Sequence, residues 1–135
     1  DSSLFLGKIP SWLEVLSKEL FNAGVIGFIP DQIIVNEYVD NQGIALHIDC
    51  EPCFEDCIVS LSLGGSCVMD FIKNKNSQST TKISLLIPSR TLLVMKDESR
   101  YNWYHGIPSR KKDIFNGITY PRARRVSITF RKVIL

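Results

Sequence analysis

The sequence contains no apolar run that approaches the roughly 18 consecutive residues of a membrane-spanning helix. It does not open with the basic and apolar regions of a secretory signal, and internal repeats and low-complexity tracts are also missing. These absences exclude a membrane-spanning or repeat protein and make a cytoplasmic or nuclear location the default expectation. The net charge of +2 excludes a polycation that would bind nucleic acid indiscriminately.

Cysteine pairs at metal-binding spacing are scarce. Cys50 and Cys53 form the single Cys-x-x-Cys, and Cys57 and Cys67 follow without a second one. A structural zinc site normally needs four ligands, so zinc is disfavoured. We therefore expect free, reduced thiols in a reducing compartment.

What is present describes one globular domain. At 135 residues, with 44% apolar and 22% charged residues, the chain can bury a core of its own. We expect a single domain over residues 1–135, without association into oligomers, and the opening Asp1 in place of methionine indicates a domain cut from a longer protein.

Positive charge is concentrated in the C-terminal third, where Asp113 is the one acidic residue between positions 100 and 132. This asymmetry permits a polyanionic partner, and the alternative is a solvated basic face. The cations concerned are Arg100, Arg110, Lys111, Lys112, Arg122, Arg124, Arg125, Arg131 and Lys132.

One amphipathic helix is predicted near the N-terminus. Ser11 and Glu14 have the spacing of a capping box, and Gly24 is a stop signal. The apolar stripe is expected to pack on the back of a sheet and consists of Trp12, Leu13, Leu16, Leu20 and Phe21.

After Gly24 the sequence is rich in short β-type segments separated by turn residues. Strands are predicted at 32–39, 44–49, 57–63, 67–72, 82–87, 91–95, 100–105 and 124–133. A single leading helix followed by this series predicts a mainly β sandwich or barrel. Among these the jelly roll holds ligands in the mouth between two sheets.

His47 and Asp49 are the first candidate site residues. They lie two apart in a predicted strand, so both side chains leave the same face and can share a metal ion. His105, the other histidine of the chain, supplies a third ligand. Two histidines and one carboxylate are typical of open Fe(II) sites. An ordinary half-exposed strand is the alternative.

Arginines on the last predicted strand suggest an anion site. Alternation places Arg125, Ser127, Thr129 and Arg131 on one face. Buried arginines are costly unless each meets an anion, so a dicarboxylate ligand is one interpretation and an edge strand facing solvent is the other. Asn36 and Tyr38 share a face of an earlier strand, and each can hydrogen-bond a carboxylate.

Four of these patterns together resemble a known family. Asn-x-Tyr at Asn36, His-x-Asp at His47, Ser-Arg-Tyr-x-Trp-x-His-Gly-Ile from Ser99 to Ile107, and Arg-x5-Arg at Arg125 occur in the order seen in AlkB-type Fe(II)/2-oxoglutarate dioxygenases. The resemblance implies a double-stranded β-helix of the jelly-roll kind. The motifs are most similar to the tRNA-modifying AlkB homologue branch.

The resemblance also implies residue roles. His47, Asp49 and His105 would bind Fe(II), and 2-oxoglutarate and dioxygen would be co-substrates that yield succinate and CO2. The distal carboxylate of 2-oxoglutarate would meet Arg125, with help from Tyr38. Its iron-bound end would lie near Asn36 and Arg131, and Ser127 is placed with the co-substrate-binding residues.

The substrate implied by the resemblance is a modified or alkylated nucleobase in RNA, tRNA or single-stranded DNA. Glu51, which follows Asp49 by two, would engage the base, and Trp103 could stack on it. Ser127 departs from the asparagine common in repair demethylases. About thirty residues before the first predicted strand leave little room for the base-clamping lid of the family. The alternatives are a protein or small-molecule hydroxylase and a catalytically idle jelly-roll binding module.

Overall fold

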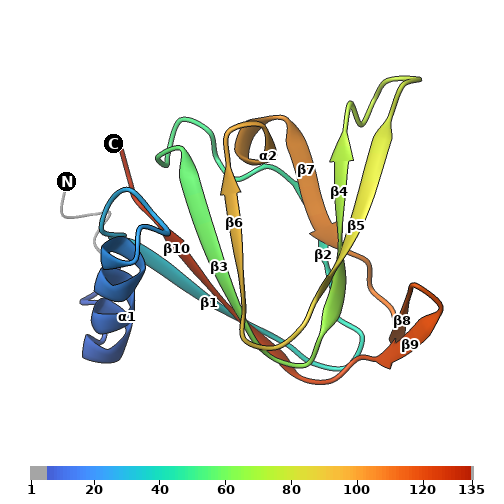
Figure 1. The fold of residues 1–135 in the computed structure, drawn as a ribbon, viewed down its shortest axis with the longest axis horizontal. Helices are drawn as coiled ribbons and strands as arrows, with labels where there is room; N and C mark the ends of the chain where they lie inside the picture. The colour runs from blue at the N-terminus through green and yellow to red at the C-terminus, as the bar shows by residue number, and fades with distance from the viewer. Residues whose placement is uncertain (1–5, 135) are drawn as a thin grey trace.

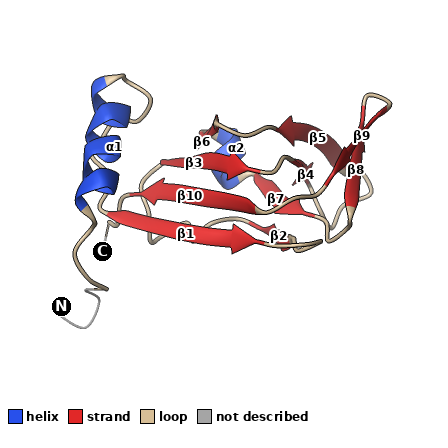
Figure 2. Cartoon of the chain, turned by 90° about the horizontal axis from the view of Figure 1, so that it is seen from below, coloured by secondary structure: helices blue, strands red, loops and turns tan. Residues whose placement is uncertain are grey.

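The computed structural model describes residues 6–134 and forms two four-stranded antiparallel sheets that face each other, as predicted for a jelly roll (Figure 1). The first sheet has the order β1-β10-β3-β6, with bounds Gln32–Tyr38, Arg125–Arg131, Cys57–Gly64 and Thr91–Lys96. The second has the order β2-β7-β4-β5, with bounds Ile44–His47, Trp103–Ile107, Cys67–Lys73 and Thr81–Ile87. β8 (Lys112–Phe115) and β9 (Ile118–Pro121) form a separate hairpin beside the second sheet (Figure 2).

β10 is central to the first sheet because it pairs with β1 on one side and β3 on the other. Its register sets Arg125 opposite Tyr38 and Ser127 opposite Asn36 on β1. Residues that are opposite each other on neighbouring strands point to the same face. The polar faces of β1 and β10 are therefore one continuous surface that looks toward the second sheet.

The other face of the first sheet carries α1 (Ser11–Asn22). Leu13 and Leu20 of the helix belong to one buried cluster with Val59 of β3 and Phe130 of β10. Burying several such side chains stabilises the packing by about 1.5–3 kcal/mol for each one. This confirms the prediction that the helix packs on the back of a sheet.

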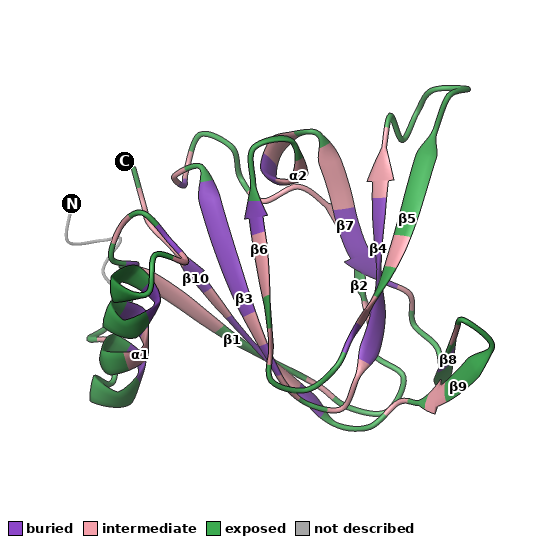
Figure 3. Ribbon diagram, viewed as in Figure 1, coloured by how far each residue is buried: buried purple, intermediate pink, exposed green. Residues whose placement is uncertain are grey.

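A second buried cluster lies between the two sheets and includes Ile58 of β3, Phe71 of β4 and Ile107 of β7. Burial is concentrated along β3 and the first five residues of β4, whereas much of β5 is exposed (Figure 3). β3 is buried on both faces because it contributes to both clusters.

Some local predictions were wrong. The helix is capped by Pro10 without a side-chain hydrogen bond, so the Ser11 and Glu14 capping box does not form. Its apolar stripe is narrower than predicted, since Trp12 and Phe21 are exposed. The strand predicted at 100–105 is instead a short helix, α2 (Glu98–Tyr101), followed by β7.

The β8–β9 hairpin was not predicted. Neither described helix is long and apolar enough to cross a membrane.

Candidate functional site

His47, Asp49 and His105 come together as predicted. One ligand atom from each lies within 4.8 Å of the other two. His47 ends β2 and is paired with His105 of β7, while Asp49 lies just beyond β2. The Nε2 atoms of the two histidines lie 3.3 Å and 3.6 Å from Oδ1 of Asp49. This donor set fits a divalent metal such as Fe(II), which two histidines and one carboxylate bind with positions left open.

The His47 ring is oriented by its own strand. Nδ1 donates a hydrogen bond of 2.9 Å to the carbonyl oxygen of Ala45, which leaves Nε2 as the ligand atom. The hydrogen bond with Asp49 raises the pKa of His47 above its ordinary value, while burial acts in the opposite direction. A metal ion would therefore have to displace a proton from His47 in mildly acidic solution.

Asp49 is prepared to act as an anionic ligand. Burial alone would raise its pKa, but the hydrogen bonds and charges of His47, His105 and Arg131 outweigh burial and lower the pKa to about 2. Arg131 Nη1 donates to Asp49 Oδ2 at 3.0 Å, which leaves Oδ1 facing the histidines. Arg131 is itself held by Gln32, whose Oε1 accepts from Nε at 2.9 Å, and lies over the ring of Phe54.

His105 is kept neutral by its surroundings. Burial lowers its pKa to about 4, and the neighbouring His47 acts in the same direction. The side chain of His105 is 11% exposed, and the centre of its ring lies 4.3 Å from the centre of the His47 ring. A neutral imidazole is the form that binds a metal.

These three residues line one end of a cavity of about 320 Å³ between the two sheets. The polar faces of β1 and β10 form one wall, as the alternation predicted. That wall consists of Asn36, Tyr38, Arg125, Ser127, Thr129 and Arg131.

Arg125 is the buried cation of this wall and is 4% exposed. Its Nε donates to Ser62 Oγ at 2.8 Å, and its guanidinium lies 5.2 Å from the centre of the Tyr38 ring. Four arginines pair with carboxylates, namely Arg110, Arg122, Arg124 and Arg131, but within residues 6–134 no carboxylate pairs with Arg125. A buried guanidinium in a cavity is stabilised by a carboxylate ligand that accepts two parallel hydrogen bonds.

The two predicted substrate residues lie outside this cavity wall. Glu51 is exposed in the turn that follows Asp49 and is not among the lining residues. Trp103 packs against the cluster between the sheets and lines a separate apolar recess with Phe71 and Leu85. The cavity and its metal end therefore form without either residue.

Sequence reasoning missed two residues that support the site. Ser62 is 1% exposed and holds Arg125; the alternation of the strand at 57–63 was the signal that could have placed it. Arg100 is 2% exposed and donates to the carbonyl oxygens of Asp49 and Cys50. These contacts join residues about fifty positions apart, so no local sequence pattern could predict them.

The cysteine prediction was half wrong. Cys50 and Cys53 are joined by a disulfide in the loop after Asp49, whereas Cys57 and Cys67 are free and buried. Burial raises the pKa of both free thiols, which keeps them protonated.

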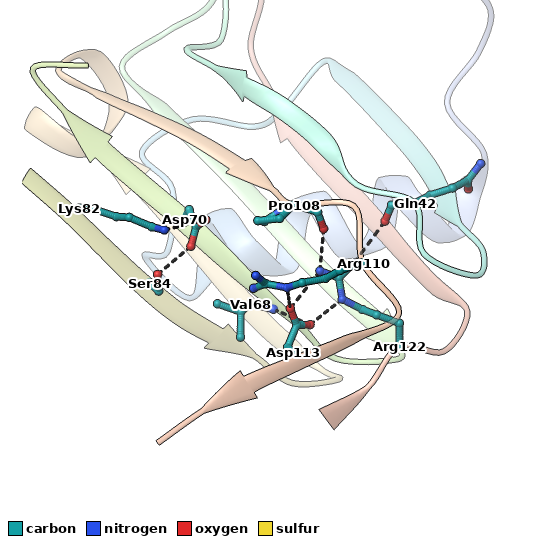
Figure 4. A network of polar contacts seen from close by, with 9 residues as sticks. All are labelled: Gln42, Val68, Asp70, Lys82, Ser84, Pro108, Arg110, Asp113 and Arg122. Carbon is teal, nitrogen blue, oxygen red and sulfur yellow. Dashed lines mark hydrogen bonds and ion pairs between the residues drawn. The ribbon is translucent and has the colours of Figure 1, made fainter. Parts of the chain in front are cut away.

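Five of the nine C-terminal cations pair with carboxylates within residues 6–134. Asp113 is fully buried and binds Arg110 and Arg122, and it also accepts the N–H of Val68 (Figure 4). Arg122 Nη2 also donates to the carbonyl of Pro108 at 2.9 Å. The network ties the β8–β9 hairpin to the second sheet. Arg124 pairs with Glu37 and Lys132 with Asp31.

Comparisons with known proteins agree with this geometry. Residues 4–131 match the model of the 2OG-Fe(II) oxygenase superfamily. The chain is 46% identical over 127 residues to the uncharacterized protein L905 of Acanthamoeba polyphaga mimivirus, covering 94% of this chain and 60% of that protein. It is 39% identical over 143 residues to the tRNA (carboxymethyluridine(34)-5-O)-methyltransferase ALKBH8 of Mus musculus, covering 94% of this chain but 21% of that protein.

A solved structure described as "The structure of OsALKBH1" has the same fold, with a TM-score of 0.63 at 22% identity over 93% of this chain and 65% of that chain. The metal ligands, the buried arginine and the family match over nearly the whole chain lead to one assignment. The chain belongs to the 2OG-Fe(II) oxygenase superfamily and, within it, to the AlkB-type dioxygenases.

Proposed function

We propose that the chain oxidises a modified or alkylated nucleobase with Fe(II), 2-oxoglutarate and dioxygen, and releases succinate and CO2. One observation carries this proposal: Arg125, a buried arginine with which no carboxylate among the described residues pairs, shares a cavity with two histidines and an aspartate that could hold a metal ion. A dicarboxylate with a metal-binding end would satisfy both parts of the cavity at once.

The roles of the residues follow from their contacts. His47, Asp49 and His105 would hold Fe(II), which when bound supplies the activation of dioxygen and the binding of the keto acid. Arg125, oriented by Ser62 and covered by Tyr38, would bind the distal carboxylate of 2-oxoglutarate. Ser127, hydrogen-bonded to Ser60 at 3.1 Å, and Asn36 line the wall between the two ends. Arg131 would keep Asp49 ionised and oriented.

RNA is favoured over DNA as the substrate class. The mouse relative carries the name of an enzyme that acts on a uridine of tRNA, and its matched segment covers 94% of this chain. Glu51 is exposed in the turn that follows Asp49, and in this proposal it would meet a base that enters from outside the cavity. Residues outside the cavity, such as Glu51, would then select the substrate, and oxidation would take place inside the cavity at the metal.

The first experiment measures succinate release from anaerobically purified chain given Fe(II), ascorbate, 2-oxoglutarate and air, with and without methylated single-stranded RNA or DNA. His47→Ala is the matched control, because it removes one metal ligand and leaves Arg125 in place. Stimulation by the oligonucleotide with formaldehyde in equal amount supports demethylation, and stimulation without formaldehyde supports stable hydroxylation.

Slow succinate release that no oligonucleotide stimulates would contradict the nucleobase proposal and favour a protein or small-molecule hydroxylase. Equal release by wild type and His47→Ala would contradict the metal assignment.

A further inference from the structure

Arg100 is a buried cation whose charge is not matched by a carboxylate in the described part of the chain. It lies in α2, is 2% exposed, and its guanidinium stacks 4.7 Å from the centre of the Tyr101 ring. Its guanidinium donates hydrogen bonds to three backbone carbonyls of the loop between β2 and β3. Nη1 donates to Asp49 at 2.8 Å, Nη2 to Cys50 at 3.1 Å and Nε to Glu55 at 3.5 Å.

The loop that Arg100 holds carries a metal ligand but has no strand of its own. β2 ends at His47 and β3 begins at Cys57, so Asp49 lies outside the ladders that fix the two histidines. A ligand on irregular backbone needs other contacts to hold its position, because loop residues otherwise move more than strand residues.

Asp49 is therefore held at both ends by arginines from different parts of the fold. Arg131 of β10 holds the carboxylate, and Arg100 of α2 holds the main-chain carbonyl. Two adjacent carbonyls, those of Asp49 and Cys50, accept from one planar guanidinium. Lysine cannot reproduce this arrangement, because its ammonium is a single point of donation on a flexible stem.

We propose that Arg100 is a positioning residue that fixes the backbone of Asp49 and Cys50, so that the Asp49 carboxylate meets both histidines. This role rests on the metal centre of the proposed function and extends it to a residue that does not touch the metal. Support of this kind typically changes metal affinity by about 10- to 100-fold when it is lost.

The test is titration of the metal-free chain with Co(II) alone, followed by calorimetry and by the visible absorption of the bound ion, which reports ligand geometry. Arg100→Lys keeps the charge and removes the paired donors. We expect its Co(II) dissociation constant to rise about tenfold or more and its absorption spectrum to change. Arg124→Lys, at an exposed arginine that pairs with Glu37 outside the cavity wall, is the matched control and should bind Co(II) like wild type.

Unchanged Co(II) affinity and spectrum in Arg100→Lys, with only a lower melting temperature, would overturn the positioning role. If Arg100→Lys does not fold, Arg100→Gln decides, because it removes the buried charge and replaces the fork that donates to the Asp49 and Cys50 carbonyls with a single, shorter amide nitrogen. A weaker affinity in the same direction supports the proposal, and wild-type affinity overturns it. If His47→Ala binds Co(II) as tightly as wild type, the metal centre itself is wrong, and the proposed function fails with it.

Discussion

Single side chains in the cavity act through the groups that orient them. Arg125 points its guanidinium into the cavity, yet its Nε is occupied by Ser62, a residue buried in β3. A hydrogen bond to a charged group contributes about 1.5–3 kcal/mol. Loss of this contact should therefore weaken the affinity of Arg125 for an anion.

Ser62→Ala should raise the KM for 2-oxoglutarate by roughly tenfold, since a buried charged donor loses its partner and the guanidinium can turn away from the anion. Succinate release at varied 2-oxoglutarate, without other substrate, measures this effect. Ser17→Ala is the control: Ser17 is 1% exposed like Ser62, but it lies in α1 and its hydroxyl has no hydrogen-bond partner in the part of the chain that the structure describes. Equal KM values in the two variants would show that Ser62 does not orient Arg125.

Residue patterns predicted much of the site at this scale. Alternation along a strand was enough to group Arg125, Ser127 and Arg131 on the cavity wall, because period-two geometry is local. The role of Arg100 could not be found this way, since its partners are backbone carbonyl groups about fifty residues away. Every residue has a backbone carbonyl, so the sequence does not show which ones accept a hydrogen bond. Asp113 looked like a lone acid in a basic run, although folding buries it between Arg110 and Arg122.

At the scale of elements, the pairing of β2 with β7 sets the distance between the two histidines. Gly106 of β7 lies against β2 so closely that an added Cβ would come within 2.9 Å of the Ile44 carbonyl oxygen and of the Leu46 nitrogen. Both are backbone atoms, so the strand as a whole would have to shift. His47 is the residue at the end of that strand.

Gly106→Ala should therefore weaken Co(II) binding about tenfold and lower the free energy of unfolding by about 1–3 kcal/mol, as overpacking of an interior does. Gly27→Ala is the matched control, because no atom of residues 6–134 lies within 4 Å of its added Cβ and its backbone is not in the left-handed region. Titration with Co(II) and urea unfolding of both variants give the comparison. Normal metal affinity in Gly106→Ala would mean that β2 does not set the position of His47.

Elements were predicted well where they are long and alternate regularly, and poorly where tertiary contacts decide. α2 replaces a predicted strand because Arg100 hydrogen-bonds to the loop after Asp49 and stacks on Tyr101 within the same short helix. The β8–β9 hairpin is short, has exposed apolar residues at Ile114 and Ile118, and is fixed to the sheet through Asp113. For both α2 and the β8–β9 hairpin, the local sequence pattern does not favour the observed structure over a strand or a loop.

For the whole molecule, the metal-free chain should be most stable near pH 6.5. The pKa of His47 is raised, so its stabilising contact is fully present below its ordinary value of 6.5 and is lost as the pH rises through the folded-state pKa. The pKa of His105 is lowered from 6.5 to about 4, so stability falls as the solution is acidified between these values, by about 3 kcal/mol for a shift of this size.

Urea unfolding in the presence of a chelator, from mildly alkaline pH to about pH 4, measures this profile. His105→Gln should remove most of the loss on the acid side, and His47→Gln should remove the decline on the alkaline side. The prediction fails if stability rises steadily on acidification through this range in the wild-type chain.

The disulfide between Cys50 and Cys53 begins at the residue that follows Asp49, and it closes a covalent ring in the loop that carries this ligand. Thiol reductants such as dithiothreitol, often added to keep iron in the ferrous state, would open that ring by thiol exchange, whereas ascorbate would leave it closed. Two preparations that differ only in the reductant would thus contain two different ligand loops. Alkylation followed by peptide mass mapping of residues 45–56 shows which of the two loops a given preparation contains.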